Sequence, residues 1–220
     1  MFDLDGTLID SRQDLAESTN ELLVSYGAAP LSFDEATSFV GDGARVLVER
    51  ALAASALDVD VNAALDRFLT IYDRRLLNYT TPYDGVPELL AWAASQAPVA
   101  VLTNKPTGPA VRLLEALGLA PFVRWTIGGD AGFARKPDPS ALQHLMSDAG
   151  AQPERTLMVG DSMVDVETGR RAGAHVCAAG YGFGHIRAPL DLRTEEWRAD
   201  RVEDVKPAIE AVLSRRASPD

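Results

Sequence analysis

The chain has very little cysteine and no long apolar run, and each shortage excludes a class of protein. Its single cysteine, Cys177, cannot form an internal disulfide, which fits the reducing cytoplasm where we expect the protein to reside. No run approaches the roughly 18 uninterrupted apolar residues that a membrane span needs. Residues 1–3 show neither the basic nor the apolar region of a signal peptide. We therefore expect neither a membrane anchor nor export.

Positive charge is also in short supply. The chain has 21 basic against 32 acidic residues, which gives a formal net charge of −11. This charge repels the phosphates of nucleic acids and anionic membranes, so neither is an expected partner. Eighteen of the basic residues are arginine, and the lysines are Lys105, Lys136 and Lys206 alone. A small anion can still bind where a local site supplies positive charge.

The composition that remains is that of a folded domain. The 220 residues are 46% hydrophobic and 24% charged, which is enough for one large core with a modest insert. Disorder, collagen and coiled coil are excluded for the chain as a whole.

Hydrophobic periodicity divides the chain into two kinds of structure. Residues 12–85 carry four segments with helical spacing and no convincing strand, and Ser32 with Glu35 forms a capping box. From Val86 onward, short apolar runs alternate with helices, which is typical of a parallel sheet covered on both faces. The expected strands after the insert are 99–103, 125–128, 156–160 and 176–179. The sequence thus predicts a helical insert on a doubly wound, Rossmann-like α/β core.

Acidic side chains stand at the ends of the predicted strands. Asp3 and Asp5 flank Leu4, so strand geometry places both carboxylates on one face and turns Leu4 into the core. In open parallel sheets, ligands bind beyond the carboxyl ends of the strands. Clustered carboxylates repel one another unless a cation lies between them, and a hard ion such as Mg²⁺ suits oxygen ligands. The acids expected to meet there are Asp3, Asp5, Asp161 and Asp165.

Four motifs occur in order along the chain. They are Asp3-Leu4-Asp5-Gly6-Thr7-Leu8, Thr103, Lys136, and Gly160-Asp161 through Asp165. Together they resemble the four motifs of the haloacid dehalogenase superfamily, over essentially the whole chain. The resemblance implies an α/β catalytic core of residues 1–11 and 86–220 and a small all-helical cap of residues 12–85 after the first strand. Within the superfamily, the segments 39–45 and 50–52 are similar to the cap of phosphoglycolate phosphatases.

The resemblance implies a Mg²⁺-dependent phosphomonoester hydrolase with an aspartyl-phosphate intermediate. Asp3 would attack phosphorus, and Asp5 would protonate the leaving alcohol and then deprotonate the hydrolytic water. The metal would be held by the carboxylates of Asp3 and Asp161 and by the backbone carbonyl of Asp5. Asp165 would support the metal from outside or through water.

The remaining motif residues would bind the phosphoryl group. Thr103 and the backbone N–H of Asn104 would bind phosphate oxygens, and Lys136 would neutralise charge on the phosphoryl group and nucleophile. Asp3, Asp5, Thr103 and Lys136 are therefore the expected catalytic residues.

The cap contributes a candidate substrate loop. Gly41, Gly43 and Arg45 lie at a helix start, where an anion such as the carboxylate of phosphoglycolate would be favoured. The same loop could equally be a plain link between two helices. The expected partner is a small phosphorylated metabolite, phosphoglycolate above others, and the expected state is a monomer or homodimer.

Single residues argue against some of the other functions that the same fold can have. Asp5 argues against a dehalogenase, since halide departure needs no proton donor. The absence of lysine from 12–85 argues against a phosphonatase that uses a cap lysine. A non-catalytic relative would be expected to lack a nucleophile or metal ligand, and none is missing. A sugar-phosphate phosphatase, a pyrophosphatase and a β-phosphoglucomutase remain open alternatives.

The predicted first strand is unusually short. Only Met1 and Phe2 precede the expected nucleophile, whereas a typical strand has about five or six residues. Because a central strand pairs on both sides, we expect Met1 to be an internal start and the native protein to begin several apolar residues upstream.

Overall fold

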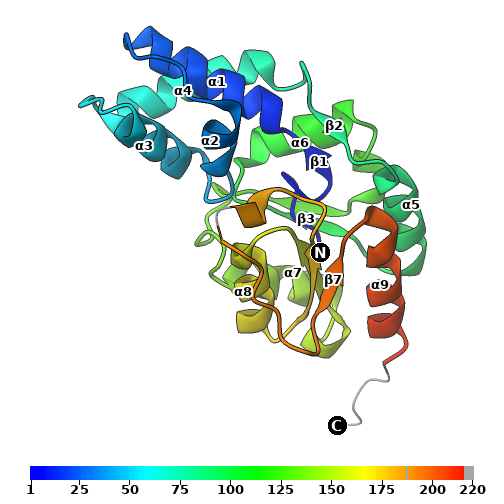
Figure 1. The fold of residues 1–220 in the computed structure, drawn as a ribbon. Helices are drawn as coiled ribbons and strands as arrows, with labels where there is room; N and C mark the ends of the chain where they lie inside the picture. Colours follow the sequence, from blue (N-terminus) through cyan, green and yellow to red (C-terminus); the bar gives the residue numbers. More distant parts are fainter. Residues whose placement is uncertain (187, 216–220) are drawn as a thin grey trace.

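A parallel sheet forms the centre of the computed structural model, which describes residues 1–186 and 188–215 (Figure 1). Phe2 pairs in parallel with Val101 on one side and Val159 on the other, and so joins the strands into the order β4–β3–Phe2–β5–β6–β7. The strands are β3 (Ala100–Leu102), β4 (Trp125–Ile127), β5 (Leu157–Gly160), β6 (His175–Ala179) and β7 (Trp197–Ala199). The parallel sheet is therefore as predicted, except for β7, which the sequence analysis missed.

The first residues lie in the middle of this sheet. The Phe2 N–H donates to Ala100 O at 2.9 Å, and the Asp3 N–H donates to Val159 O at 2.8 Å. Phe2 is buried and belongs to the main apolar cluster. This pairing places Asp3 at the carboxyl edge of the sheet, between the ends of β3 and β5.

Helices cover both faces of the sheet, as predicted. Those of one face share the main apolar cluster, and those of the other pack against Met158 and Leu102. Gly150 and Gly173 end two of the helices in the left-handed region, with φ of 61° and 74°. The first face carries α5 (Val86–Gln96), α6 (Thr107–Ala116) and α9 (Val205–Leu213), and the second carries α7 (Ser140–Ala149) and α8 (Met163–Ala172).

Four more helices lie above the carboxyl edge of the sheet (Figure 1). They are α1 (Arg12–Ser25), α2 (Phe33–Ser38), α3 (Ala44–Ala54) and α4 (Val61–Arg75). α1 packs against α2 and α4, and α3 packs against α4. The predicted capping interaction starts α2, where Ser32 Oγ accepts from the Glu35 N–H at 3.2 Å.

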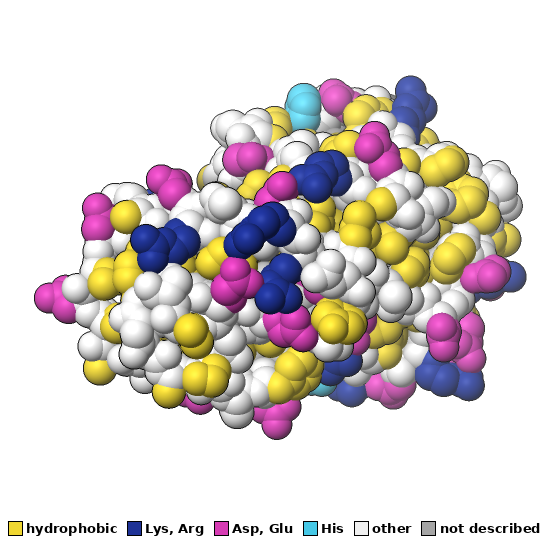
Figure 2. Space-filling model, turned by 90° about the horizontal axis from the view of Figure 1, so that it is seen from above, with side chains coloured by type: hydrophobic (Ala, Val, Ile, Leu, Met, Phe, Trp, Pro, Cys, Tyr) yellow, Lys and Arg dark blue, Asp and Glu magenta, His cyan; other side chains and the backbone are white. Residues whose placement is uncertain are grey.

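Ion pairs reinforce the contact between α1 and α4. Arg75 contacts Glu17 at 2.7 Å and Glu21 at 2.8 Å, and Arg74 contacts Glu21 at 2.9 Å. On the face seen from above, basic side chains accordingly lie beside acidic ones and not in one basic patch (Figure 2).

Two linkers connect this helical layer to the sheet. β1 (Ile9–Asp10) pairs antiparallel with β2 (Thr81–Pro82), so a short strand does occur within the segment that the sequence predicts to be helical only. It has two residues and includes a proline, so no alternating pattern could reveal it. The buried Asp14 fixes the return linker, since its Oδ2 accepts from Tyr79 N, Thr80 N and Thr80 Oγ1 at 3.0, 2.9 and 2.7 Å.

None of the helices in the described residues is both long enough and apolar enough to span a membrane.

Candidate active site

Three carboxylates and one ammonium meet at the carboxyl edge of the sheet. Asp3 ends the central segment, Asp161 follows β5, and Asp165 lies in the first turn of α8. One oxygen from each of the three lies within 4.8 Å of those from the others. The Lys136 Nζ lies 2.9 Å from Asp3 Oδ1 and 2.5 Å from Asp165 Oδ1. We call these four residues the acidic cluster, and each was predicted from a sequence motif.

The acidic cluster fits a divalent cation. Three carboxylates and one ammonium carry two net negative charges, and the ligand atoms offered are all oxygens, as Mg²⁺ prefers. Burial raises the pKa of Asp3 to about 7, even though the charge of Lys136 lowers it. Burial, followed by the charges of Asp165 and Asp3, raises the pKa of Asp161 well above its ordinary value. A cation at this position would offset both the burial and the repulsion that raise these pKa values.

The backbone fixes the Asp161 carboxylate by one oxygen. Its Oδ2 accepts from the Phe183 N–H at 2.9 Å and from the Gly184 N–H at 2.6 Å. A Cβ at Gly6, where φ is +82°, would lie 1.8 Å from the same oxygen, so the first motif requires glycine there. Within the described residues, no hydrogen bond reaches Asp161 Oδ1, which leaves that atom for a ligand.

Asp165 differs from Asp161 because both of its oxygens are engaged. Ser162 donates to Oδ2 from its hydroxyl at 2.7 Å and its backbone N–H at 3.2 Å, and Lys136 donates to Oδ1. This arrangement orients the Lys136 ammonium toward Asp3. Asp165 is therefore connected to Asp3 through the ammonium of Lys136.

Asp3 is the acid of this cluster that also lines a cavity between the sheet and the helical layer. The Leu4 N–H at 2.7 Å and Lys136 at 2.9 Å both contact its Oδ1. Its Oδ2 receives no hydrogen bond from the described residues. A carboxylate oxygen that is free, and next to an ammonium, is placed to attack an electrophile or bind a cation.

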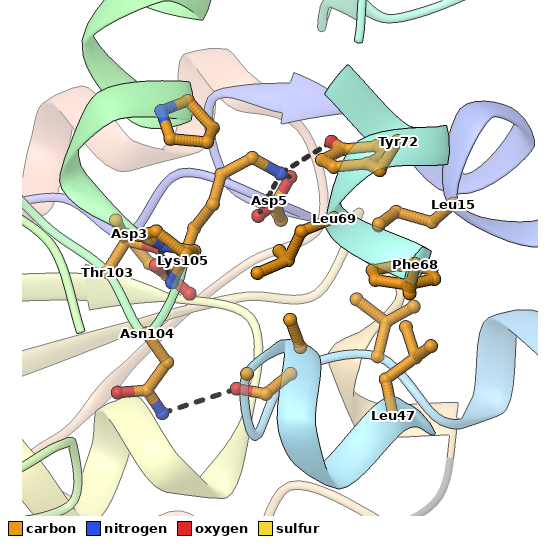
Figure 3. A pocket seen from close by; sticks show the side chains of 16 residues that line it. Asp3, Asp5, Leu15, Leu47, Phe68, Leu69, Tyr72, Thr103, Asn104 and Lys105 are labelled. Atoms are coloured by element: carbon orange, nitrogen blue, oxygen red, sulfur yellow. Dashed lines mark hydrogen bonds and ion pairs between the residues drawn. The ribbon is translucent and has the colours of Figure 1, made fainter. Parts of the chain in front are cut away.

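The helical layer and the sheet enclose this cavity together (Figure 3). The sheet side contributes Asp3, Asp5, Thr103, Asn104, Lys105, Pro106 and Pro109. The helical layer contributes Leu15, Val40, Gly41, Gly43, Ala44, Leu47, Phe68, Leu69 and Tyr72. The structure therefore brings the predicted Asp3, Asp5, Thr103, Asn104, Gly41 and Gly43 to one place.

Asp5 lies in the cavity with its own cation. The Lys105 Nζ lies 3.0 and 3.1 Å from the two Asp5 carboxylate oxygens and donates to the Tyr72 hydroxyl at 2.6 Å. Ser11 Oγ donates to Asp5 Oδ1 at 2.5 Å. Burial raises the pKa of Tyr72 to about 12, so this hydroxyl keeps its proton. We call Asp5, Lys105 and Tyr72, with the apolar side chains from α1, α3 and α4, the cap-facing end.

The glycine loop of the helical layer touches the sheet side directly. Asn104 Nδ2 donates to Gly41 O at 3.4 Å and to Lys136 O at 3.2 Å. Gly43 has a φ of +91°, and a Cβ there would lie 3.2 Å from Asn104 O. The loop therefore needs glycine for both its conformation and its close approach.

The structure does not bring Arg45 to the cavity, contrary to expectation. Its Nη2 donates to Asn62 Oδ1 at 2.6 Å, and its Nη1 lies 3.7 Å from Glu49 Oε1 on the exposed side of α3. One helical residue is a rotation of about 100°, so the neighbouring Ala44 faces the cavity and Arg45 faces away.

Two residues of the cap-facing end were not assigned a role from the sequence. Lys105 stands beside Thr103 and Asn104 and is one of only three lysines, which is a signal that could have identified it. Tyr72 belongs to an apolar helical stripe of α4, and only the packing of that helix over the sheet shows that its hydroxyl reaches Lys105.

Comparison with known proteins shows the family of the chain. A family model described as haloacid dehalogenase-like hydrolase matches residues 1–179. The chain belongs to this family. It is 39% identical over 217 residues to phosphoglycolate phosphatase 1 of Pseudomonas aeruginosa. The match covers 96% of this chain and 79% of that protein. The chain is 42% identical over 191 residues to a phosphoglycolate phosphatase of Rhodospirillum rubrum, covering 83% of this chain and 79% of the relative.

A solved structure shares the whole architecture. The crystal structure of a predicted phosphoglycolate phosphatase from Haemophilus somnus 129pt superposes with a TM-score of 0.88 at 30% identity. The match covers 94% of this chain and 95% of that one, so the helical layer is part of the shared fold. The haloacid dehalogenase resemblance and the predicted fold class are thereby confirmed.

Proposed function

We propose that this chain is a Mg²⁺-dependent phosphomonoester hydrolase that acts through an aspartyl-phosphate, with phosphoglycolate as its favoured substrate. The observation that carries the proposal is the presence of Asp3 and Asp5 in one cavity, each beside a different lysine. A nucleophile and a proton carrier are both needed to displace an alcohol from phosphorus. Two adjacent carboxylates in distinct surroundings supply the two roles.

Asp3 performs the displacement. Its free Oδ2 attacks phosphorus, the P–O bond to the alcohol breaks, and an acyl phosphate forms on Asp3. Asp5 gives its proton to the leaving oxygen and then takes one from the water that hydrolyses the acyl phosphate. Asp3 is thereby regenerated and inorganic phosphate is released.

The other predicted residues stabilise charge during these steps. Mg²⁺, when bound by Asp3, Asp161 and the Asp5 carbonyl, would neutralise charge on the phosphoryl oxygens. Asp165 would hold Lys136 in place, and the ammonium of Lys136 would face the nucleophile and the phosphoryl group. Thr103 Oγ1 and the Asn104 N–H would donate to phosphoryl oxygens.

Residues 12–85 would act as a cap over the core of residues 1–11 and 86–220. The paired linkers β1 and β2 and the anchoring of Thr80 by Asp14 join the two parts at one edge. The contacts of Asn104 with Gly41 close the opposite side of the cavity. A cavity that holds little water strengthens the charge interactions of Asp3 and Asp5 during the displacement, and it needs to admit only the water that hydrolyses the acyl phosphate.

A panel of phosphorylated compounds tests the proposal. Phosphate release is measured with and without Mg²⁺ for phosphoglycolate, a hexose phosphate, pyrophosphate and p-nitrophenyl phosphate. We expect the highest kcat/KM for phosphoglycolate and loss of all activity in EDTA. Transfer of phosphate between sugar hydroxyls, or a higher kcat/KM for pyrophosphate or the hexose phosphate, would contradict the assigned substrate.

A further inference from the structure

The cap-facing end of the cavity holds one cation in an apolar wall. Lys105 is the only basic residue among the described residues that line the cavity. The side chains of the helical layer that line the cavity are hydrocarbon, except for the hydroxyl of Tyr72 (Figure 3). The apolar members that Figure 3 labels are Leu15, Leu47, Phe68 and Leu69.

The position of Lys105 is set from two sides. Asp5 of the core holds the ammonium through both carboxylate oxygens, and Tyr72 of α4 holds it from above at 2.6 Å. The side chain of Lys105 is 6% exposed. Because Tyr72 belongs to the helical layer and Asp5 to the core, Lys105 links the two parts at the point where a leaving group would lie.

A buried ion pair is a poor way to stabilise a fold. Removing two charges from water costs several kcal/mol per ion, and an apolar pair of similar volume is often as stable or more so. Lys105 therefore needs a further explanation. Lys136 does not serve the same purpose, because its ammonium is shared between Asp3 and Asp165 at the other end.

The geometry of the displacement places the rest of the substrate next to Lys105. The leaving oxygen must lie within hydrogen-bond reach of Asp5, about 2.6–3.2 Å. The Asp5 carboxylate touches the Lys105 ammonium, so atoms two or three bonds beyond the leaving oxygen reach that ammonium. In a phosphate ester of a 2-hydroxy acid, the carboxylate occupies this position.

The apolar wall disfavours a sugar phosphate as the substrate. A sugar phosphate carries several hydroxyl groups, and each one buried without a partner costs about 1–3 kcal/mol. The side chains of the cap-facing end that line the cavity offer only the groups of Asp5, Lys105 and Tyr72 as hydrogen-bond partners for such a ligand. A carboxylate needs a cation, which Lys105 provides at this end.

We infer that Lys105, held in place by Tyr72, determines specificity by binding the carboxylate of a short 2-phospho-acid substrate. The inference rests on the proposed phosphatase function and assigns to Lys105 the recognition that the sequence suggested for Arg45. Tyr72 is a positioning residue, because it acts through the Lys105 ammonium. Asp5 releases part of its contact with Lys105 when the substrate carboxylate arrives.

Two matched substrates isolate this recognition. Phosphoglycolate and 2-hydroxyethyl phosphate have the same ester linkage. The first carries a carboxylate where the second carries a hydroxymethyl group. Their kcat/KM ratio is measured for the wild type, Lys105→Met, Lys105→Arg and Tyr72→Phe, with Lys206→Met as the control for loss of one lysine. Lys206 lies in α9, with its Nζ over the Trp92 ring, and does not line the cavity.

We expect Lys105→Met to lower the ratio about 10- to 100-fold, the value of a hydrogen bond to a charged group. Lys105→Arg should restore part of the ratio, Tyr72→Phe should lower it less than Lys105→Met, and Lys206→Met should leave it unchanged. A wild type that favours phosphoglycolate, with a ratio unaltered by Lys105→Met, overturns the inference and leaves the proposed function standing. A wild type that hydrolyses neither ester overturns the proposed function, and the inference with it.

Product inhibition gives a second readout that does not depend on proton donation. The Ki of glycolate is measured against p-nitrophenyl phosphate, whose leaving group departs without a proton. Lys105→Met should raise this Ki at least about tenfold. If Lys105→Met does not fold, Tyr72→Phe supplies the test, since it removes one hydroxyl; a Ki within about twofold of the wild type then counts against the inference.

Discussion

The acidic cluster carries an excess of negative charge, whereas the charges of the cap-facing end balance each other. In the acidic cluster, three carboxylates share one ammonium, and the pKa values of Asp3 and Asp161 are raised as a result of burial and mutual repulsion. In the cap-facing end, Asp5 and Lys105 balance each other within an apolar wall. The acidic cluster suits a cation and a phosphoryl group, whatever alcohol the phosphoryl group is attached to. The cap-facing end has no unmatched charge, and its Lys105 and Tyr72 have no proposed part in the displacement itself, so these two can select among substrates.

Removal of the proposed nucleophile, Asp3, should cause the largest loss of activity. Asp3→Asn should lower kcat by on the order of 10⁴-fold or more on every phosphate ester, because an amide cannot form the acyl phosphate. Phosphate release measures the loss, and a thermal melt shows whether the fold survives. Asp84→Asn, at an exposed position, is the matched control. Activity above a hundredth of the wild type would exclude Asp3 as the nucleophile.

Asp5→Asn tests whether the two carboxylates have separate roles. Loss of a general acid costs about 10²–10⁴-fold for an alkoxide leaving group, so phosphoglycolate hydrolysis should fall by this factor. Hydrolysis of p-nitrophenyl phosphate should fall by less than about tenfold, since p-nitrophenolate needs no proton. Steady-state kinetics on both substrates measures the difference. Equal losses would remove Asp5 from the proton-transfer role.

The raised pKa values of Asp3 and Asp161 should make the metal-free protein less stable as the pH rises. A carboxyl whose pKa is raised on folding binds more protons in the folded than in the unfolded state, between the ordinary value of 3.8 and the raised one. The free energy of unfolding contributed by Asp3 and Asp161 should therefore fall as the pH rises from 4 through about 7. Thermal melts in EDTA across this range measure it.

Asp161→Asn separates this effect from the overall negative charge of the chain. The substitution should raise the Tm in EDTA at pH 7.5 by about 2–4 °C for each kcal/mol of repulsion removed, and flatten the pH dependence. We also expect Mg²⁺ to raise the Tm of the wild type and to leave that of Asp161→Asn unchanged. A variant with the same pH slope as the wild type would show that the acidic cluster is not the source.

The smallest effect is expected at Arg45. Its guanidinium pairs with Asn62 and Glu49 on the exposed side of α3, and such surface contacts are worth about 0–1 kcal/mol. Arg45→Ala should therefore change the KM for phosphoglycolate by less than about twofold. Measurement of the KM for phosphoglycolate in Arg45→Ala and Lys105→Met in parallel compares the two substitutions directly. A rise of tenfold would mean that α3 turns toward the cavity when the substrate binds.

Much of the core was predictable because its signals are local. Ser32 caps α2 as its spacing to Glu35 indicates, and Gly150 and Gly173 end α7 and α8 in the left-handed conformation that glycine favours. β2 and β7 were missed because neither lies in an apolar run: β2 is Thr81–Pro82, and β7 has Arg198 between Trp197 and Ala199. β3 and β4 also have three residues, but each lies within a predicted apolar segment. Strands such as β2 and β7 exist only because a neighbouring strand supplies hydrogen-bond partners.

The sequence by itself predicted the three carboxylates and the lysine of the acidic cluster, but it also predicted Asp5 there, and the structure pairs Asp5 with Lys105 instead. Parallel strands end at one edge of a sheet, so Asp3 and Asp161 had to meet once the strands were recognised. The cap-facing end was decided by tertiary structure alone. Whether Ala44 or Arg45 faces the cavity, and whether the Tyr72 hydroxyl reaches Lys105, depends on how α3 and α4 rotate as they pack. A shift of one residue turns a helix by about 100°, and the periodicity of the sequence does not specify which neighbour each face will meet.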